Sequence, residues 1–171
     1  MAANNKKCWS VDLRVQSSEE LLTWCLDREG VDRMLVVVRS PRELERLPAR
    51  LFGTNVLEDF AASAWPGTEL IGHSARVFVV KFDQSIAEVI LRTQPDLRKW
   101  LHASNPPLPE DICLFDSNAD SPTLITVSHE ELCWIIAERK PKLAGIRETS
   151  VRVEELFWEG QYFCRPWTKG K

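Results

Sequence analysis

The stretch Met34-Leu35-Val36-Val37-Val38 decides the fold. It is a run of five apolar residues, three of them β-branched, and it has the length of a strand. A run without polar alternation indicates a strand that is covered on both faces, so it belongs in the interior of a sheet. Further strands are predicted over residues 8–15, 69–71, 76–82, 112–115 and 123–127. The segments 69–71 and 76–82 are expected to pair as a hairpin.

Capping boxes predict where several helices begin. Ser17-Ser-Glu-Glu20, Ser40-Pro-Arg-Glu43 and Ser128-His-Glu-Glu131 each place a serine three residues before a glutamate. This spacing satisfies the free N–H groups at the start of a helix. The predicted helices cover residues 17–30, 40–47, 54–61, 85–91, 95–101 and 128–136. Because helices and strands do not alternate regularly, we expect an α+β fold with a mainly antiparallel mixed sheet and several short helices.

The length of 171 residues and the hydrophobic content of 44% suit one globular domain. We expect this domain to span residues 1–171, with flexible ends at 1–7 and 166–171. The longest apolar run is strand-sized and the N-terminal residues are polar, so neither a membrane span nor a signal peptide is expected. The five cysteines are odd in number and widely spaced, which favours buried, reduced thiols and a cytoplasmic location.

Several function classes lack support in the sequence. The net charge of −3 argues against a nucleic-acid-binding protein, which would carry a basic excess. The chain has neither a glycine-rich phosphate loop nor a Gly-x-Ser-x-Gly motif, so nucleotide hydrolysis and ester hydrolysis are not indicated. We therefore expect no cofactor, and the sequence favours a non-enzymatic role.

His129 is the histidine with the most chemical potential. On the predicted helix it shares a face with Cys133, four residues later, which is a spacing that two zinc ligands could use. It also lies beside Glu130 and Glu131, which leaves general acid–base catalysis open. The Asp116-Ser-Asn-Ala-Asp120 segment copies the start of a calcium loop, but Val127 stands where the bidentate glutamate is needed. We expect no metal site and no catalytic residue.

The strongest pattern is electrostatic. Residues 100–138 contain no lysine or arginine, so the acids of this segment have no local cation. If the turn and the helix start hold them at one end of the molecule, they form an acidic docking surface. The expected partner-binding residues are Glu110, Asp111, Asp116, Asp120, Glu130 and Glu131.

These patterns lead to two functional hypotheses of different classes. The first is a non-enzymatic cytoplasmic protein-interaction module, of the inhibitor or immunity type, that binds a basic surface of another protein through the acidic hairpin and helix end. The alternative is a small enzyme that uses His129 with a neighbouring carboxylate. A pocket around His129 would favour the enzyme, and an acidic surface would favour the interaction module.

Overall fold

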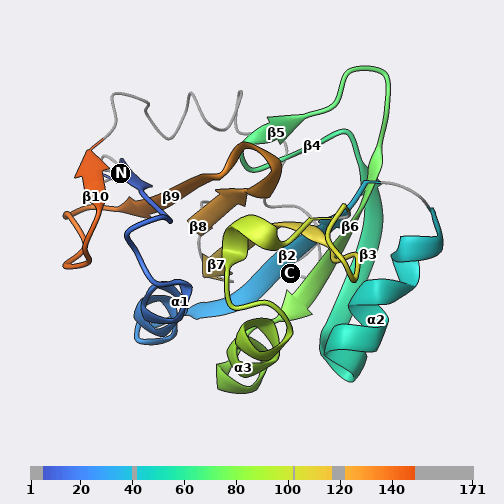
Figure 1. The fold of residues 1–171 in the computed structure, drawn as a ribbon, viewed down its shortest axis with the longest axis horizontal. Helices are drawn as coiled ribbons and strands as arrows, with labels where there is room; N and C mark the ends of the chain where they lie inside the picture. The colour runs from blue at the N-terminus through green and yellow to red at the C-terminus, as the bar shows by residue number, and fades with distance from the viewer. Residues whose placement is uncertain (1–5, 40–41, 102, 117–121, 149–171) are drawn as a thin grey trace, which may run out of the picture.

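The strand predicted over residues 34–38 lies in the interior of an eight-stranded sheet. The computed structural model describes residues 6–39, 42–101, 103–116 and 122–148, and Figure 1 shows its elements. The predicted strand is β2 (Val31–Val38). It pairs antiparallel with β6 (Ala75–Lys81) on one side and with β7 (Glu110–Asp116) on the other.

The other strands of this sheet are β1 (Lys7–Val11), β3 (Val56–Ala62), β8 (Pro122–Val127), β9 (Leu132–Ala137) and β10 (Ile146–Glu148). The strand order is β10-β1-β9-β8-β7-β2-β6-β3, and all neighbouring strands are antiparallel. A separate small hairpin consists of β4 (Ala64–Trp65) and β5 (Thr68–Glu69). The helices are α1 (Ser18–Leu26), α2 (Leu47–Phe52) and α3 (Gln84–Thr93). Short 3₁₀ turns are η1 (Arg42–Arg46), η2 (Gly53–Asn55), η3 (Leu97–Lys99) and η4 (Ser128–Glu130).

Alternate residues of β2 face two separate cores. Met34, Val36 and Val38 pack in the core that includes the apolar faces of α1 and α3. Leu35 and Val37 belong to a second core on the opposite face of the sheet. Figure 1 shows the three helices together on one side of the sheet and the β4–β5 hairpin on the other. Burial on both faces explains why this strand is apolar throughout.

The small hairpin seals part of the second face. Trp65 of β4 is 2% exposed and packs in the second core. The turn that follows brings Gly67 against β8, where an added Cβ would lie 2.7 Å from Val127 Cγ2. Gly67 has a φ of +81°, so the turn needs glycine both for its backbone conformation and for its close approach to the sheet.

The helix predicted over residues 128–136 is wrong. Ser128 makes no capping hydrogen bond, and the chain forms only the turn η4 before Glu131 adopts a left-handed φ of +55°. The next residues form β9, whose side chains alternate between the two cores. A short apolar run fits a strand that is buried on both faces as well as a helix, so periodicity does not separate the two.

The helix predicted over residues 54–61 is also wrong, because this segment forms β3 at the edge of the sheet. β3 pairs with β6, and an ion pair between Asp59 and Arg76 also connects the two strands. These tertiary contacts override the helical pattern of the segment. The expected hairpin between residues 69–71 and 76–82 does not form. Instead β5 pairs with β4, and β6 pairs with β2 and β3. Residues 95–101 contain only the turn η3.

The fold class is confirmed as α+β, with one large antiparallel sheet and a few short helices. The cap at Ser17 is also confirmed, since its side chain accepts the N–H of Glu20 at the start of α1. Among the described residues, no helix is long and apolar enough to cross a membrane. The predicted calcium-like turn around Asp120 lies outside the described residues, as do residues 1–5 and 166–171 of the chain ends that we expected to be flexible, whereas Lys7 belongs to β1.

The described cysteines are Cys8, Cys25, Cys113 and Cys133, and all four are buried free thiols. Burial raises the pKa of Cys8 to about 12, and burial also raises the pKa values of the other three thiols. These thiols therefore stay protonated and act as small apolar core residues. The fifth cysteine, Cys164, lies outside the described residues.

Candidate functional site

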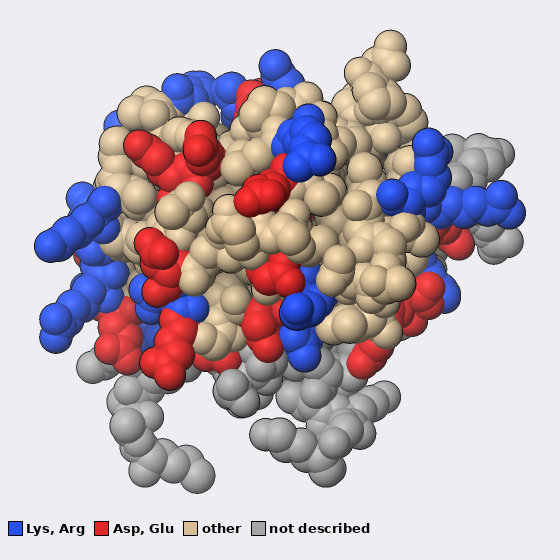
Figure 2. Space-filling model, turned by 90° about the horizontal axis from the view of Figure 1, so that it is seen from below, with Lys and Arg blue, Asp and Glu red and all other residues tan. Residues whose placement is uncertain are grey.

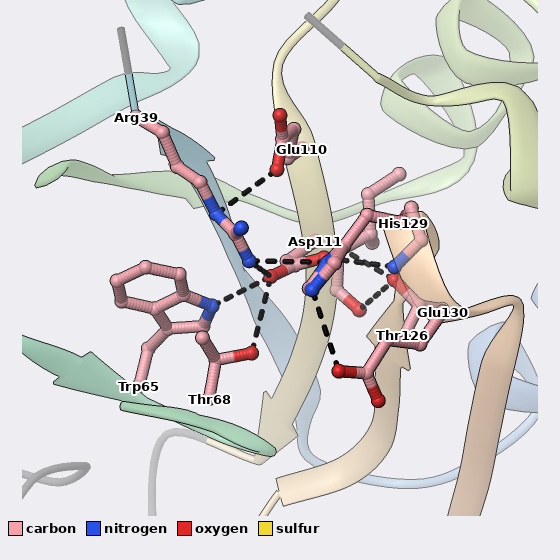
Figure 3. Close-up of polar contacts among 10 residues, drawn as sticks. Arg39, Trp65, Thr68, Glu110, Asp111, Thr126, His129 and Glu130 are labelled. Carbon is pink, nitrogen blue, oxygen red and sulfur yellow. Dashed lines mark hydrogen bonds and ion pairs between the residues drawn. The ribbon is translucent and has the colours of Figure 1, made fainter. Parts of the chain in front are cut away.

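Three strand ends lie together at one end of the sheet, and charged side chains from these ends are in contact there. β2 ends immediately before Arg39, β7 begins at Glu110 and Asp111, and β8 runs into the turn that carries His129. The antiparallel pairing of Val37 with Glu110 sets the register between two of these ends. Side chains up to 90 residues apart in the sequence thereby come into contact (Figure 3).

Arg39 supplies the positive charge of this cluster. Its Nε lies 3.0 Å from Glu110 Oε2, and its Nη2 lies 3.5 Å from Asp111 Oδ2. Both carboxylate side chains are 0% exposed, whereas the Arg39 side chain is 21% exposed. The contact with Glu110 has the distance of an ion pair without the alignment of a hydrogen bond. Leaving a buried charge without its partner costs about 3–5 kcal/mol, so the two acids require this guanidinium.

Asp111 is the acceptor at the centre of the cluster (Figure 3). Its Oδ2 accepts hydrogen bonds from Trp65 Nε1 at 2.7 Å and from Thr68 Oγ1 at 3.5 Å. Its Oδ1 accepts the backbone N–H of Ser128 at 2.8 Å. These contacts tie β7 to the small hairpin and to η4. Asp111 has a φ of +45°, a conformation that is costly for a residue other than glycine, so its contacts hold a strained backbone in place.

Two neighbours complete the buried part of the cluster. The guanidinium of Arg39 lies over the Trp65 ring, 5.4 Å from the ring centre, which adds a cation–π contact. Thr126 bridges the adjoining backbone, since its Oγ1 accepts the N–H of Ile112 at 2.8 Å and donates to the Ile112 carbonyl at 3.1 Å. The start of β7 is therefore fixed by side chains from β4 and β8 as well as by Arg39.

His129 connects this buried cluster to the surface. Its Nδ1 lies 3.1 Å from Arg39 Nη2, and its Nε2 lies 3.5 Å from Glu130 Oε1. Because a guanidinium can only donate, Nδ1 must be the acceptor, which places the ring proton on Nε2. The side chains of His129 and Glu130 are 34% and 58% exposed. To act as a base through Nδ1, His129 would first have to release Arg39, so the arrangement favours a positioning role.

Glu110, Asp111 and His129 each offer one donor atom within 4.8 Å of the others, which is a grouping that could hold a metal ion. The same two carboxylates already contact the guanidinium of Arg39. A divalent cation would have to share them with this positive charge. The chemistry of the cluster therefore points to an internal ion-pair network.

The zinc alternative, which was not the expected one, required His129 and Cys133 on one face of a helix, and the structure has no helix there. η4 ends at Glu130 and β9 begins at Leu132, so a chain reversal separates the two side chains. Cys133 is 2% exposed and packs in the core on the helix side of the sheet. His129 instead contacts Arg39.

The structure separates the six acids that the sequence places on one docking surface. Glu110 and Asp111 are fully buried, because their carboxylates neutralise Arg39 inside the molecule. Asp116 stands at the opposite end of β7, about 20 Å away at 3.3 Å per residue. Its carboxyl group packs so closely on Gly30 that an added Cβ there would lie 2.6 Å from it.

The other three acids have different positions. Asp120 lies outside the described residues. Glu130 and Glu131 are exposed and lie beside each other at the end of the sheet that contains Arg39. Of the predicted partner-binding residues that are described, this adjacent pair fits an exposed acidic site.

No family model, curated protein or solved structure matches the chain. The geometry of the molecule itself must therefore carry any functional proposal. The buried cluster contacts Ser128 and His129 of the turn that precedes the exposed residues Glu130 and Glu131.

A surface cavity of about 320 Å³ adjoins Glu130 and Glu131. Besides these two acids, its lining residues are Ser10, Val11, Asp12, Leu13, Arg14, Arg98, Leu132, Gly145 and Arg147. They come from the end of β1 and the loop after it, η3, the start of β9, and β10 with the residue before it. The cavity therefore lies where several loops meet at the same end of the sheet as Arg39.

Sequence reasoning missed Arg39 and Trp65 as parts of this site. A signal for Arg39 was present, since it directly follows an apolar strand while Glu110 and Asp111 directly precede another. Charges at the ends of buried strands need opposite charges nearby, and antiparallel pairing places one strand's end beside the other's start. No comparable local pattern marks Trp65, whose contact with Asp111 depends on how the small hairpin folds over the sheet.

Proposed function

We propose that this protein is a non-enzymatic protein-interaction module whose partner binds at the end of the sheet formed by η4, the start of β9 and the adjoining cavity. The observation that carries this proposal is the pair Glu130 and Glu131, exposed beside a cavity of about 320 Å³. These acids offer charge to a basic side chain of the partner. The role fits an inhibitor or immunity-type protein.

Exposed apolar side chains at the same end support the proposal. Val15 and Leu132 are 64% and 38% exposed, and they are two of the four large apolar side chains that are exposed in the described part of the chain. Leu132 lines the cavity, and Val15 Cβ lies 3.4 Å from a Cβ built on Gly145, which also lines it. Interfaces combine apolar contacts at their centre with polar groups around them.

The buried cluster gives this surface its rigidity. Asp111 holds the backbone of Ser128, and Arg39 contacts His129, so two consecutive residues of η4 are anchored from within. A partner that binds an ordered turn loses less conformational entropy than one that must order a mobile loop. In this proposal Glu110 and Asp111 support the interface without touching the partner.

Cytoplasmic location is part of the proposal. The four described cysteines are buried free thiols, which suits a reducing compartment. A basic surface on a cytoplasmic protein is accordingly the partner that we expect.

Affinity purification from producing cells, followed by quantitative mass spectrometry, tests this function. The bait variants are wild type, the double variant Glu130→Lys/Glu131→Lys, and the control Glu29→Lys/Glu138→Lys. The control changes the net charge equally, and its two exposed residues lie beside a different cavity. We expect a partner that wild type and control retain and that the Glu130/Glu131 variant loses by roughly tenfold or more. The same set of proteins on all three baits would contradict the proposal.

A further inference from the structure

The cavity beside Glu130 contains two kinds of charged group. Arg14 and Arg98 already have partners, since Asp12 accepts two side-chain hydrogen bonds from Arg14 and Asp96 accepts two from Arg98. These hydrogen bonds, and then the nearby charges that include Glu131, raise the pKa values of both arginines. Arg14 and Arg98 are thus each paired with a nearby aspartate.

Glu131 and Arg147 differ from those pairs. Both side chains are exposed and line the cavity. Within the part of the chain that the structure describes, neither the Glu131 carboxylate nor the Arg147 guanidinium has a hydrogen bond or an ion pair with another side chain. The cavity therefore offers one carboxylate, near the charges of Arg14 and Arg98, and one guanidinium, near the charge of Asp12, that are not hydrogen-bonded to these neighbours. They come from separate elements, β10 and the turn between η4 and β9.

Leu132 is the exposed apolar side chain of the lining, at 38% exposure, whereas Val11 and Leu13 are buried at 4% and 8% and border the cavity from the core. Gly145 lines the cavity without a side chain, so it leaves room beside the backbone of Asp12, to which its carbonyl is hydrogen-bonded at 3.0 Å. The volume of about 320 Å³ is at the lower end of the range for small-molecule sites.

We propose that this cavity binds a small zwitterion, specifically an α-amino acid with an apolar side chain. The ligand carboxylate pairs with Arg147, its ammonium group pairs with Glu131, and its side chain contacts the exposed Leu132. This inference does not depend on the proposed protein partner, because it concerns a ligand that the purified protein binds alone. If both hold, the ligand occupies the surface on which the partner docks and competes with it.

Titration of the purified full chain with L-leucine, L-methionine and L-phenylalanine, followed by two-dimensional NMR, tests the inference. We expect saturable shifts for at least one of them, with a dissociation constant on the order of a millimolar or below. The shifts should include the amides of Leu132 and Gly145. For the amino acid that binds, the N-acetyl derivative lacks the ammonium charge and the amide derivative lacks the carboxylate. Each should bind about tenfold more weakly.

Two conservative variants locate the site. Glu131→Gln and Arg147→Gln keep the size of each side chain, and each should weaken binding about tenfold. Glu138→Gln and Arg139→Gln are the matched controls, since both residues are exposed and line the other cavity. These controls should bind as wild type does. No saturable shift with any of the three amino acids, or equal binding of the charged and blocked forms, would overturn the inference. The amino-acid titration and the partner capture can fail separately.

Discussion

Arg39 is the residue that links the buried charge cluster to the exposed turn η4. It is an internal cation between two fully buried carboxylates, and its outer edge contacts His129. One side chain therefore compensates the buried charges and also holds the exposed turn. A lysine could supply the charge, but it lacks the planar group that reaches Glu110, Asp111 and His129 together.

Replacing Arg39 by methionine should destabilise the protein by about 3–5 kcal/mol, because Glu110 and Asp111 lose their buried cation. The control is Arg76→Met, which removes an ion pair with Asp59 whose side chains are 38% and 41% exposed. That change should cost no more than about 1 kcal/mol. Urea unfolding followed by circular dichroism measures both. Equal losses in the two variants would show that the Arg39 cluster is not a buried charge network.

Asp83 provides a residue-scale test of pH dependence. Its hydrogen bond from Ser85, assisted by Lys81 and by the N–H of Ile86 at the start of α3, lowers the pKa of Asp83 to about 2. A carboxyl group with a lowered pKa stabilises the fold above its unfolded pKa of about 3.9. That contribution is lost as the pH falls from about 4 through about 2.

Asp83→Asn keeps the capping oxygen but removes the charge. We expect the variant to be less stable than wild type at pH 7, by up to about 1 kcal/mol because the site is largely solvated. The difference should shrink steadily as the pH falls from about 4 to about 2, where about half of wild-type Asp83 is neutral. Urea midpoints of both proteins from pH 7 to pH 2 are the measurement, and a difference that stays constant over this range would refute the assignment.

At the scale of elements, the predictions succeed where one structure alone fits the local pattern. The apolar run of β2 and the cap at Ser17 are both confirmed. The amphipathic stretch of α3 is also confirmed as a helix, with Ile86, Ala87 and Ile90 on its buried side. In these segments the pattern of buried residues agrees with the local backbone preference.

The failures occur where the sheet decides the structure. β9 is apolar because both of its faces are covered, and an apolar run of that length also fits a helix. β3 carries a helical pattern but completes the edge of the sheet through its pairing with β6. The burial of Glu110 and Asp111 follows from a contact with Arg39 across some 70 residues of sequence, which no local window contains.

The small hairpin offers a test at this scale. Gly67→Ala should destabilise the protein more than Gly72→Ala, although both glycines have similar φ values of +81° and +73°. The shared backbone strain is about 1–2 kcal/mol. Only at Gly67 would the new Cβ meet Val127 Cγ2, at 2.7 Å, whereas nothing lies within 4 Å at Gly72. Overpacking adds about 1–3 kcal/mol. Thermal unfolding of both variants measures the two losses of stability. Equal losses would mean that the hairpin does not pack on β8 as described.

At the scale of the whole molecule, charge is distributed more evenly than the sequence pattern indicates. Figure 2 shows acidic and basic side chains interspersed on the face seen from below. The acids of the lysine-free segment divide between the buried cluster, the two ends of the sheet and residues outside the described part. The acidic docking surface that we retain is therefore the local pair Glu130 and Glu131.

The central claim is that the exposed pair Glu130 and Glu131 steers a basic partner into place. Stopped-flow association with the captured partner, at low and at high salt, tests it most directly. Wild type should associate more slowly as salt rises, because screening weakens the attraction between exposed charges. Glu130→Lys/Glu131→Lys should associate roughly tenfold more slowly at low salt and approach the wild-type rate at high salt, while Glu29→Lys/Glu138→Lys should change the rate far less. A Glu130/Glu131 variant that associates at the wild-type rate at low salt would contradict the account.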